Sequence, residues 1–465
     1  MQDVLAGVWH TLTGEPLPAV SLNGAESVLP GTFRVEAAAT AGVAAATLAA
    51  AELLRLRGID PGTVSADARH AAASVLSERL LRVDGAPAPD VWGPLSGDYR
   101  ACDGWVRLHA NYRRHEAAVC WSLGVPAKLD AVTKTVAAKT AAEVESAVVT
   151  AGGAAAVMRS REEWLAHPQG QAVAGLPIAE IRQVGEAPKN TLFDSDRPLG
   201  GVRVLELTHV LAGPVAGRVL AAHGANVLHV GAAHLPRIPA LTMDTGQGKR
   251  SAFVALDTEG GRAKLKKLIA RADVVLQSFR PGALARIGFG PEDMAELRPG
   301  LVTADLSAYG WAGPWARRRG FDSLVQMASG IAEEGARMTG ADHPVPLPAQ
   351  ALDHTTGWLA AAAIMTAVRR SVVEGGSWNV RLSLAGTGRW LDSLGRKEPV
   401  ASTADFDDLL EDVDSGFGKL TRVRMAGGLP GAPPRWDHAS HLPGSDSAVW
   451  HPVGTPDPAT VPTGA

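Results

Sequence analysis

Few of the side chains that could do chemistry stand in a recognisable pattern. Cys102 and Cys120 lie apart, without the C-x-x-C spacing that zinc sites and redox motifs need. No G-x-G-x-x-G follows the first regular strand, VRVLEL, which disfavours a dinucleotide-binding dehydrogenase. Asp353 precedes an alanine-rich helix with Thr355 and Thr356 beside it, and an isolated carboxylate there is read most simply as a helix cap. Residue types alone therefore name no activity.

Composition sets limits on size and partners. A chain of 465 residues exceeds what one hydrophobic core usually serves, so we expect two domains or one large domain with an appendage. Hydrophobic residues make up 46% and charged residues 20%, as in an ordinary globular protein. The formal charge of -3 favours neither nucleic acid nor an anionic membrane as a partner. An anionic ligand must be held by local groups.

The N-terminal segment and the cysteines predict a location. MQDVLAGVWH lacks a basic region followed by an apolar one, so we expect no secretory signal. The apolar run from Ala41 to Leu54 contains Glu52 and is shorter than the ~20 residues that a membrane span requires. We expect a buried helix there, no metal, no disulfide, and a cytoplasmic protein.

The second half of the chain has a regular pattern. From Gly201 onward, short β-branched runs alternate with helical stretches: VRVLEL, GPVAGRVLAAHG, NVLHV, DVVLQ and LVTADL. Such alternation predicts a parallel sheet with right-handed crossovers. Residues 257–271 place Leu265, Leu268 and Ile269 at helical spacing behind a capping Asp-Thr-Glu opening. We predict an α/β fold, a Rossmann-like open parallel sheet with flanking helices, plus a smaller α+β domain.

The first half is less regular. We expect an alanine-rich helix near residues 37–57, then a hairpin in GDYRACDGWVRLHANY with Cys102, Asp103 and Gly104 at its turn. Helices are expected at Ala141–Thr150 and Arg161–His167.

A domain boundary is expected near residues 184–198, which are polar, aperiodic and hold two prolines. Residues 1–195 then form the small domain with the alanine-rich helix, and residues 196–465 form the Rossmann-like domain. In its C-terminal tail, GGLPGAPPRW and GTPDPATVPTGA predict extended, loop-like structure.

The two alanine-rich helices suggest an internal repeat. TAGVAAATLAAAELLRLRG followed by TVSADARHAAASVL parallels TTGWLAAAAIMTAVRRSVVEGG followed by WNVRLSLAGTGRWL. Aligning Gly42 with Gly357 puts Ala38 opposite Asp353, so this repeat predicts one site per chain. Shared alanine content alone would give the same likeness.

Five segments carry a resemblance to a known family. They are, in order, GVRVLELTHVLAGP, KRSAFVALD, ADVVLQSFRPGALARIGF, SAYGWAGPWARRRGFDSLVQMASG and ALDHTTGWLAAAAIMTAV. Together they resemble the family III CoA-transferases, the CaiB/BaiF family, over Pro198–Leu394. The first half, with DGWVRL and EEWLAHPQGQ, resembles the later part of a family member. The chain thus resembles a truncated first copy fused to a second copy.

The resemblance implies an activity: CoA moves from an acyl-CoA to a free carboxylic acid. The family's nucleophile, an aspartate just before an alanine-rich helix, corresponds to Asp353 in ALDHTTG. A carboxylate can attack a thioester and then carry CoA as an aspartyl thioester, without a metal or redox cofactor. By the same resemblance, residues 196–465 are the CoA-binding catalytic domain and the protein is an interlocked homodimer.

CoA contacts carry over from the family by position. They fall on His209, Ala212, Phe279, Arg286 and Arg319. Each also has a structural interpretation: His209 as a core histidine, Phe279 as core, Arg286 as a solvated charge, while Arg317 or Arg318 could take the place of Arg319.

The chain departs from the family pattern at three places. Gly231 stands where an acid is common, Ser278 stands where an asparagine is common, and the mobile glycine-rich loop has no obvious counterpart. CoA affinity and the exclusion of water are therefore open questions at this stage.

Two alternatives remain. An α-methylacyl-CoA racemase needs a histidine where this chain has Phe321, so racemisation would require His354 or His209 to substitute. The fused layout would also suit a CoA-binding subunit without turnover. The acid substrate cannot be read from the sequence.

Overall fold

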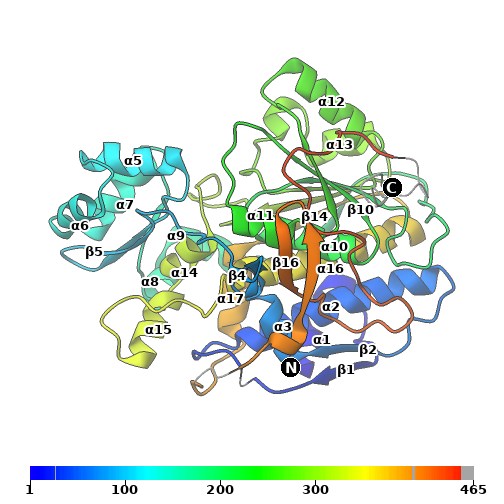
Figure 1. Cartoon of the computed structure of the whole chain (residues 1–465), viewed down its shortest axis with the longest axis horizontal. Helices are drawn as coiled ribbons and strands as arrows, with labels where there is room; N and C mark the ends of the chain where they lie inside the picture. The colour runs from blue at the N-terminus through cyan, green and yellow to red at the C-terminus, as the bar shows by residue number, and fades with distance from the viewer. Residues whose placement is uncertain (27, 401–403, 452–465) are drawn as a thin grey trace.

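The fold is organised around one large sheet, shown in Figure 1. The computed structural model describes residues 1–26, 28–400 and 404–451. The sheet has the order β11-β10-β9-β12-β13-β14-β8, parallel except for β8. Its strands are β8 (Glu180–Gly185), β9 (Arg203–Leu207), β10 (Asn226–Gly231), β11 (Lys249–Phe253), β12 (Val274–Gln277), β13 (Val302–Ser307) and β14 (Ser377–Ser383). The six parallel strands follow the order 3-2-1-4-5-6 of doubly wound sheets, which confirms the predicted fold class.

Helices cover both faces of this sheet because successive strand residues point to opposite sides. Val204 packs toward α10 and α16, whereas Leu205 packs toward α12 and α13. The helices of this half are α10 (Ala212–Ala222), α11 (Pro239–Thr245), α12 (Glu259–Ile269), the 3-10 turn η1 (Ala285–Ile287), α13 (Pro291–Leu297), α14 (Asp322–Ala328), α15 (Ile331–Thr339), α16 (Ala351–Val373) and α17 (Leu384–Ser393). Thr258 caps α12 as predicted, accepting a bond from the N–H of Gly261 at 3.0 Å.

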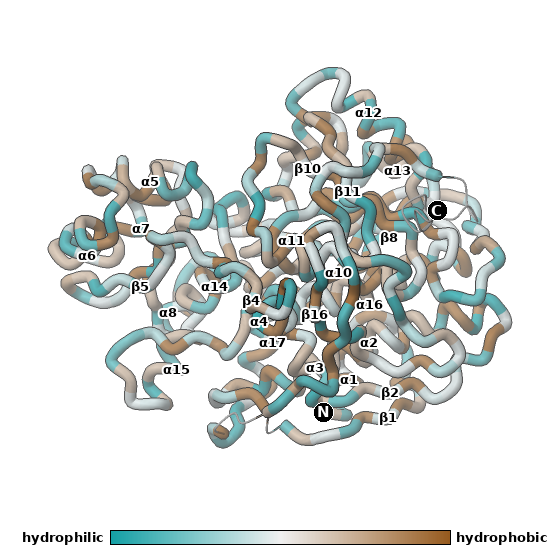
Figure 2. The backbone as a smooth tube through the Cα atoms, viewed as in Figure 1, coloured by the Kyte–Doolittle hydropathy of each residue, from teal (hydrophilic) through white to brown (hydrophobic). Residues whose placement is uncertain are grey.

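The longest helix of the first half packs against α16. This helix, α2 (Val35–Leu56), has 22 residues and is buried, which confirms the alanine-rich helix expected near residues 37–57. It is the one helix among the described residues long and apolar enough to cross a membrane, and 94% of its most apolar window is buried inside the protein. Hydrophobic segments gather around α2, α10 and α16 (Figure 2). Glycine permits the close crossing, because a Cβ on Gly42 would lie 3.1 Å from the Cβ of Trp358.

A smaller α+β unit projects from the sheet (Figure 1, left). It comprises β5 (Gly97–Arg100), β6 (Trp105–Leu108), β7 (Ala155–Val157), α5 (Arg113–Leu123), α6 (Leu129–Ala137) and α7 (Ala141–Thr150), followed by α8 (Arg161–Ala166) and α9 (Pro168–Ala174). The predicted hairpin is present, since β5 pairs antiparallel with β6. The unit has its own core around Val106 and Val119. Because β8 joins the large sheet and α2 joins its core, the division at residue 195 stays a prediction.

The remaining elements tie the two chain ends together. They are α1 (Gln2–Thr13), β1 (Val20–Asn23), β2 (Val64–Asp67), α3 (Ala68–Ser74), α4 (Ser77–Leu80), β3 (Arg82–Val83), β4 (Ala86–Pro87), η2 (Asp407–Leu409), β15 (Leu410–Ser415) and β16 (Gly418–Val423). The prediction of a loop-like tail missed β15 and β16, which form a sheet of order β15-β16-β3-β4. The pairing of β16 with β3 joins residues more than 300 positions apart, which local periodicity cannot show, whereas β15 and β16 form a local hairpin. GTPDPATVPTGA lies outside the described residues.

Candidate active site

Asp353 occupies the first turn of α16, where three chain segments converge. Its own N–H and that of Leu352 donate to the carboxylate of Asp322, the first residue of α14, with 2.8 Å from Asp353 N to Asp322 Oδ2. Asp322 thereby caps α16. The N–H of Ala212, the first residue of α10, donates to the Asp353 carboxyl. A Cβ on Gly357 would lie 2.6 Å from the carbonyl oxygen of Ala212, so glycine permits α10 and α16 to meet here.

The Asp353 carboxyl lies in an unfavourable environment for a charge. The residue is 7% exposed and Asp322 is fully buried. Burial first, and the neighbouring Asp322 carboxylate second, raise the pKa of Asp353 well above its usual value, although the N–H of Ala212 acts in the opposite direction. No Lys or Arg in the described segments forms an ion pair with either acid, so the predicted site residue is a buried carboxyl without a cation.

The corresponding turn of α2 has the opposite arrangement. Counted from the first residue of each helix, Ala37 stands opposite Asp353; counted from the glycines, Ala38 does, so an alanine occupies the place in either case. The neighbouring Glu36 is fully buried and accepts bonds from the N–H groups of Val28 and Leu29. Lys397 forms an ion pair with it at 2.5 Å. The acid in α2 is therefore neutralised, and the sequence pattern did not reveal this pair.

Aromatic side chains of the small unit border the site. The ring of His109 stacks on Phe321, with centroids 3.6 Å apart and planes 3° from parallel. Tyr112 stacks on His209 at 5.7 Å. Burial raises the pKa of Tyr112 to about 12, with Asp353 contributing, and burial lowers the pKa of His115 to about 4. The Tyr112 hydroxyl and both ring nitrogens of His115 are buried without a hydrogen-bond partner in the described part of the chain. These residues offer neutral polar groups beside Asp353.

A cleft opens near the carboxyl ends of β9 and β10, beside the first residues of β11. The carboxyl ends of parallel strands form the edge at which open α/β sheets bind ligands. Its walls include Tyr112, Glu206, Thr208, His209, Val210, Pro214, His229, Arg237, Leu241, Thr242, Thr245, Lys249, Arg250, Ser251 and His441. His209 is exposed, so it is not a core histidine. Val210 has φ 71°, a strained conformation for a β-branched residue. Asp353 is not among the wall residues but is linked to them through Ala212.

Buried and half-buried cations shape this cleft. Lys249 Nζ lies 2.7 Å from Glu206 Oε2, and both side chains are buried. Although burial opposes it, Lys249 lowers the pKa of Glu206 to about 2. At the position where the family often has an acid, a Cβ on Gly231 would lie 3.1 Å from Nη2 of Arg237. A basic side chain thus lies over the place of the missing acid.

The remaining predicted CoA contacts lie between β12 and α13 or just before α14. Phe279 is 38% exposed, so it is not simple core, and its N–H donates to Gln277 Oε1 at 2.6 Å. Arg286 is exposed and approaches Gly282. The pKa of Arg319 is lowered by burial and then by Arg280 and Arg114. The structure therefore brings Ala212 to Asp353 and His209 to Tyr112. Phe279 and Arg286 lie together between β12 and α13, and Arg319 lies just before α14.

Sequence reasoning missed several residues here. Arg114 and Tyr112 come from the small unit, and Arg280 follows Phe279 in SFRPG. Ala212 was predicted as a CoA contact, and in the structure its N–H donates a hydrogen bond to the Asp353 carboxyl. The SFRPG motif could have suggested Arg280, but no local signal places the small unit against the sheet.

Comparison with known proteins relates the site to a family. The model of CoA-transferase family III matches residues 199–394. An acetyl-coenzyme A transferase of Hypoxylon pulicicidum, nodX, is 34% identical over 199 residues, which cover 42% of this chain and 34% of that protein. An acyl-CoA transferase of Gibberella moniliformis is 29% identical over 432 residues, covering 82% of this chain and 73% of that one. This chain therefore spans about a third of the first relative's length.

A solved structure of a CaiB/BaiF family protein from Brucella suis is 24% identical, with a TM-score of 0.38, and covers 48% of this chain and 65% of that one. The predicted resemblance over residues 198–394 agrees with the match to the family model. Residues 199–394 of this chain, which contain Asp353 and all five predicted CoA contacts, therefore match CoA-transferase family III.

Proposed function

We propose that this protein transfers CoA from an acyl-CoA to a free carboxylic acid, with Asp353 as the covalent carrier. One observation supports this above the others: the Asp353 carboxyl is held by the N–H of Ala212 at the meeting of two helix N-termini, buried and without a cation. An uncompensated buried carboxyl costs stability, and such groups cluster at functional sites. A carboxyl that served only to cap α16 would not need the N-terminus of a second helix, α10, beside it.

The proposed reaction has four steps with balanced bonds. An Asp353 carboxylate oxygen attacks the thioester carbonyl, the C–S bond breaks, and CoA leaves as thiolate. The thiolate attacks the aspartyl carbonyl of the mixed anhydride and releases the donor acid. The acceptor carboxylate attacks the aspartyl thioester, and the thiolate then attacks the acceptor's acyl carbon, restoring Asp353. Helix N-terminal N–H groups stabilise the oxyanions that form at each step.

The nucleotide end of CoA needs cations, and two groups of them flank His209. Arg237 and Lys249 line the cleft on one side. Arg114, Arg280 and Arg319 lie on the other side. They are close enough together that the charges of Arg280 and Arg114 lower the pKa of Arg319. We assign CoA binding to these groups together with His209, Phe279 and Arg286.

The layout of the chain supports one site. In the first half, β1 and β2 are parallel and flank α2, as β13 and β14 are parallel around α16. We propose that residues 1–195 hold a truncated first copy whose nucleophile position is an alanine. The Gibberella relative, aligned over 82% of this chain, is compatible with the same layout.

A proton-transfer reaction at the same site is the second candidate. The observation that favours it is His115, whose neutral imidazole lies beside Phe321 with both nitrogens unpaired in the part of the chain that the structure describes. A neutral imidazole and a protonated Asp353 are the base and acid that an α-proton exchange needs.

One assay separates the two candidates. The protein is incubated in deuterated buffer with an acyl-CoA and an isotope-labelled free acid, and both products are followed by mass spectrometry. The proposal predicts labelled acyl-CoA without deuterium at the α-carbon. Deuterium in the acyl group without transfer would establish the second candidate instead, and binding with neither product would mean a CoA-binding subunit.

A further inference from the structure

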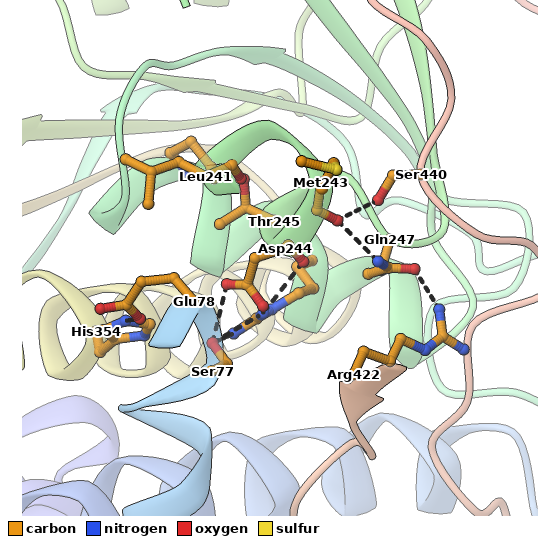
Figure 3. Close-up of polar contacts among 12 residues, drawn as sticks. Ser77, Glu78, Leu241, Met243, Asp244, Thr245, Gln247, His354, Arg422 and Ser440 are labelled. Atoms are coloured by element: carbon orange, nitrogen blue, oxygen red, sulfur yellow. Dashed lines mark hydrogen bonds and ion pairs between the residues drawn. The ribbon is translucent and has the colours of Figure 1, made fainter. Parts of the chain in front are cut away.

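A short helix of the first half reaches the residue next to Asp353. In α4, the carboxylate of Glu78 lies 2.8 Å from Nε2 of His354, and the two side chains are 3% and 0% exposed. Figure 3 shows Glu78 and His354 side by side between α4 and α16. The family match begins at residue 199, so Glu78 lies outside it. A residue of the N-terminal half thus contacts the first turn of the helix that carries Asp353.

The short helix α4 also bonds to a wall of the cleft. Ser77 Oγ donates to Asp244 Oδ2 at 2.9 Å (Figure 3). Arg218 Nη1 lies 2.8 Å from Asp244 Oδ1. Asp244 belongs to α11, whose residues Leu241, Thr242 and Thr245 line the cleft. Neighbouring residues of one four-residue helix therefore bond to the cleft wall and to α16.

The Glu78–His354 contact is a buried hydrogen bond that favours an ionised Glu78. Burial raises the pKa of Glu78, but the charge of His354 and its hydrogen bond outweigh it and bring the pKa below its usual value. Other charged groups near the pair are Arg79, at 3.9 Å from Glu78, and the two aspartates of the site. His354 also acts to lower the pKa of Asp322. Because buried charges are costly unless paired, each member depends on the other.

We propose that Glu78 is a positioning residue of the transfer reaction: through His354 it fixes the first turn of α16, and with it the direction of the Asp353 carboxyl. This inference rests on the proposed function. Nucleophilic attack depends steeply on orientation, and a displacement of about 1 Å can cost on the order of 100-fold in rate. Among the described residues no hydrogen bond or ion pair joins Glu78 to a cleft wall residue or to Asp353, although its charge contributes to the raised pKa of Asp353. Its loss should therefore lower kcat without raising the KM for acyl-CoA.

The test compares two matched variants. Glu78→Gln removes the carboxylate from the pair beside Asp353, and Glu36→Gln removes the fully buried carboxylate of α2 from its pair with Lys397. We expect Glu78→Gln to lower kcat by on the order of 10- to 100-fold with KM within about twofold, and Glu36→Gln to leave both within about twofold per folded molecule. Glu78→Asp, which keeps the charge, should recover part of the loss.

Three outcomes would overturn the inference. They are a Glu78→Gln enzyme with the kcat of Glu36→Gln, a KM that rises as kcat falls, or a Glu78→Asp enzyme no better than Glu78→Gln. If Glu78→Gln does not fold, His354→Gln takes its place, and an unchanged kcat in that variant overturns the inference equally. A wild-type protein that transfers no CoA to any acid would instead overturn the proposed function, so the two failures are distinguishable.

Discussion

Two alanine-rich helices, α2 and α16, lie against each other in the core, and each has a buried acid in its first turn. In α2, Glu36 is paired with Lys397 and with two backbone N–H groups. In α16, Asp353 has the N–H of Ala212 and a second acid for neighbours. A buried acid is usually paired with a cation, as Glu36 is. The proposed chemical role of Asp353 would explain this difference between the two helices, and the predictions below test it.

The largest effect is expected from Asp353→Asn. An amide is a poor nucleophile, so CoA transfer should fall by on the order of 1,000-fold or more, while the isosteric side chain keeps its contact with Ala212. Steady-state transfer from an acyl-CoA to a labelled acid measures this, with circular dichroism to check folding. A variant that keeps a tenth of the wild-type rate would contradict the assignment of the nucleophile.

The second prediction concerns pH. The attacking group is the ionised carboxylate, and the pKa of Asp353 is raised by burial and by Asp322. Below that pKa the carboxyl is protonated and inactive, so kcat should rise about tenfold per pH unit on the acidic limb and level off above the pKa.

The midpoint of this limb should lie well above ~4, the usual value for an aspartate. The profile of Glu36→Gln should coincide with that of the wild type, because Glu36 belongs to the other helix. A midpoint at about 4 would show that Asp353 has an ordinary environment in solution.

The third prediction concerns stability. Glu36→Gln leaves the buried Lys397 without its carboxylate and should reduce the free energy of unfolding by about 2–4 kcal/mol. Asp353→Asn removes no cation partner and should change it by less than about 1 kcal/mol. Urea denaturation of both variants at neutral pH measures the difference. Equal losses would mean that the two acids have the same structural role.

The smallest effect is expected at the helix crossing. In Gly42→Ala, the new methyl would lie 3.1 Å from the Cβ of Trp358, a tight contact that should cost about 1–2 kcal/mol without affecting transfer. In Gly357→Ala, the methyl would meet the Ala212 carbonyl oxygen at 2.6 Å and would separate α10 from α16. Only the second variant should therefore lose kcat. If both keep the wild-type kcat, the contact between Ala212 and Asp353 is not needed.

Local signals predicted much of the fold. The sheet, the β5–β6 hairpin and the helix over residues 141–150 follow from period, turn residues and caps, all of which act within a few positions. Asp353 itself was chosen from the family resemblance and was expected just before the helix, whereas it is the third residue of α16 and does not cap it. What could be inferred were features whose physical cause lies nearby in the chain.

The features that were missed depend on distant partners. Lys397 meets Glu36 from 361 positions away, and Glu78 meets His354 from 276. Likewise, β16 pairs with β3 across most of the chain. No periodicity or cap records such contacts, because they arise only when the two halves pack. The sequence therefore did not predict the Glu78–His354 contact beside Asp353.

Locating the covalent intermediate tests the central claim most directly. The protein is exposed to a panel of acyl-CoAs, reduced with borohydride to trap the aspartyl thioester, digested, and mapped by mass spectrometry. The account predicts a modified peptide that contains Asp353, absent in Asp353→Asn and unaffected in Glu36→Gln. An enzyme that transfers CoA with Asp353 unmodified, or with the modification on another carboxylate, would contradict it.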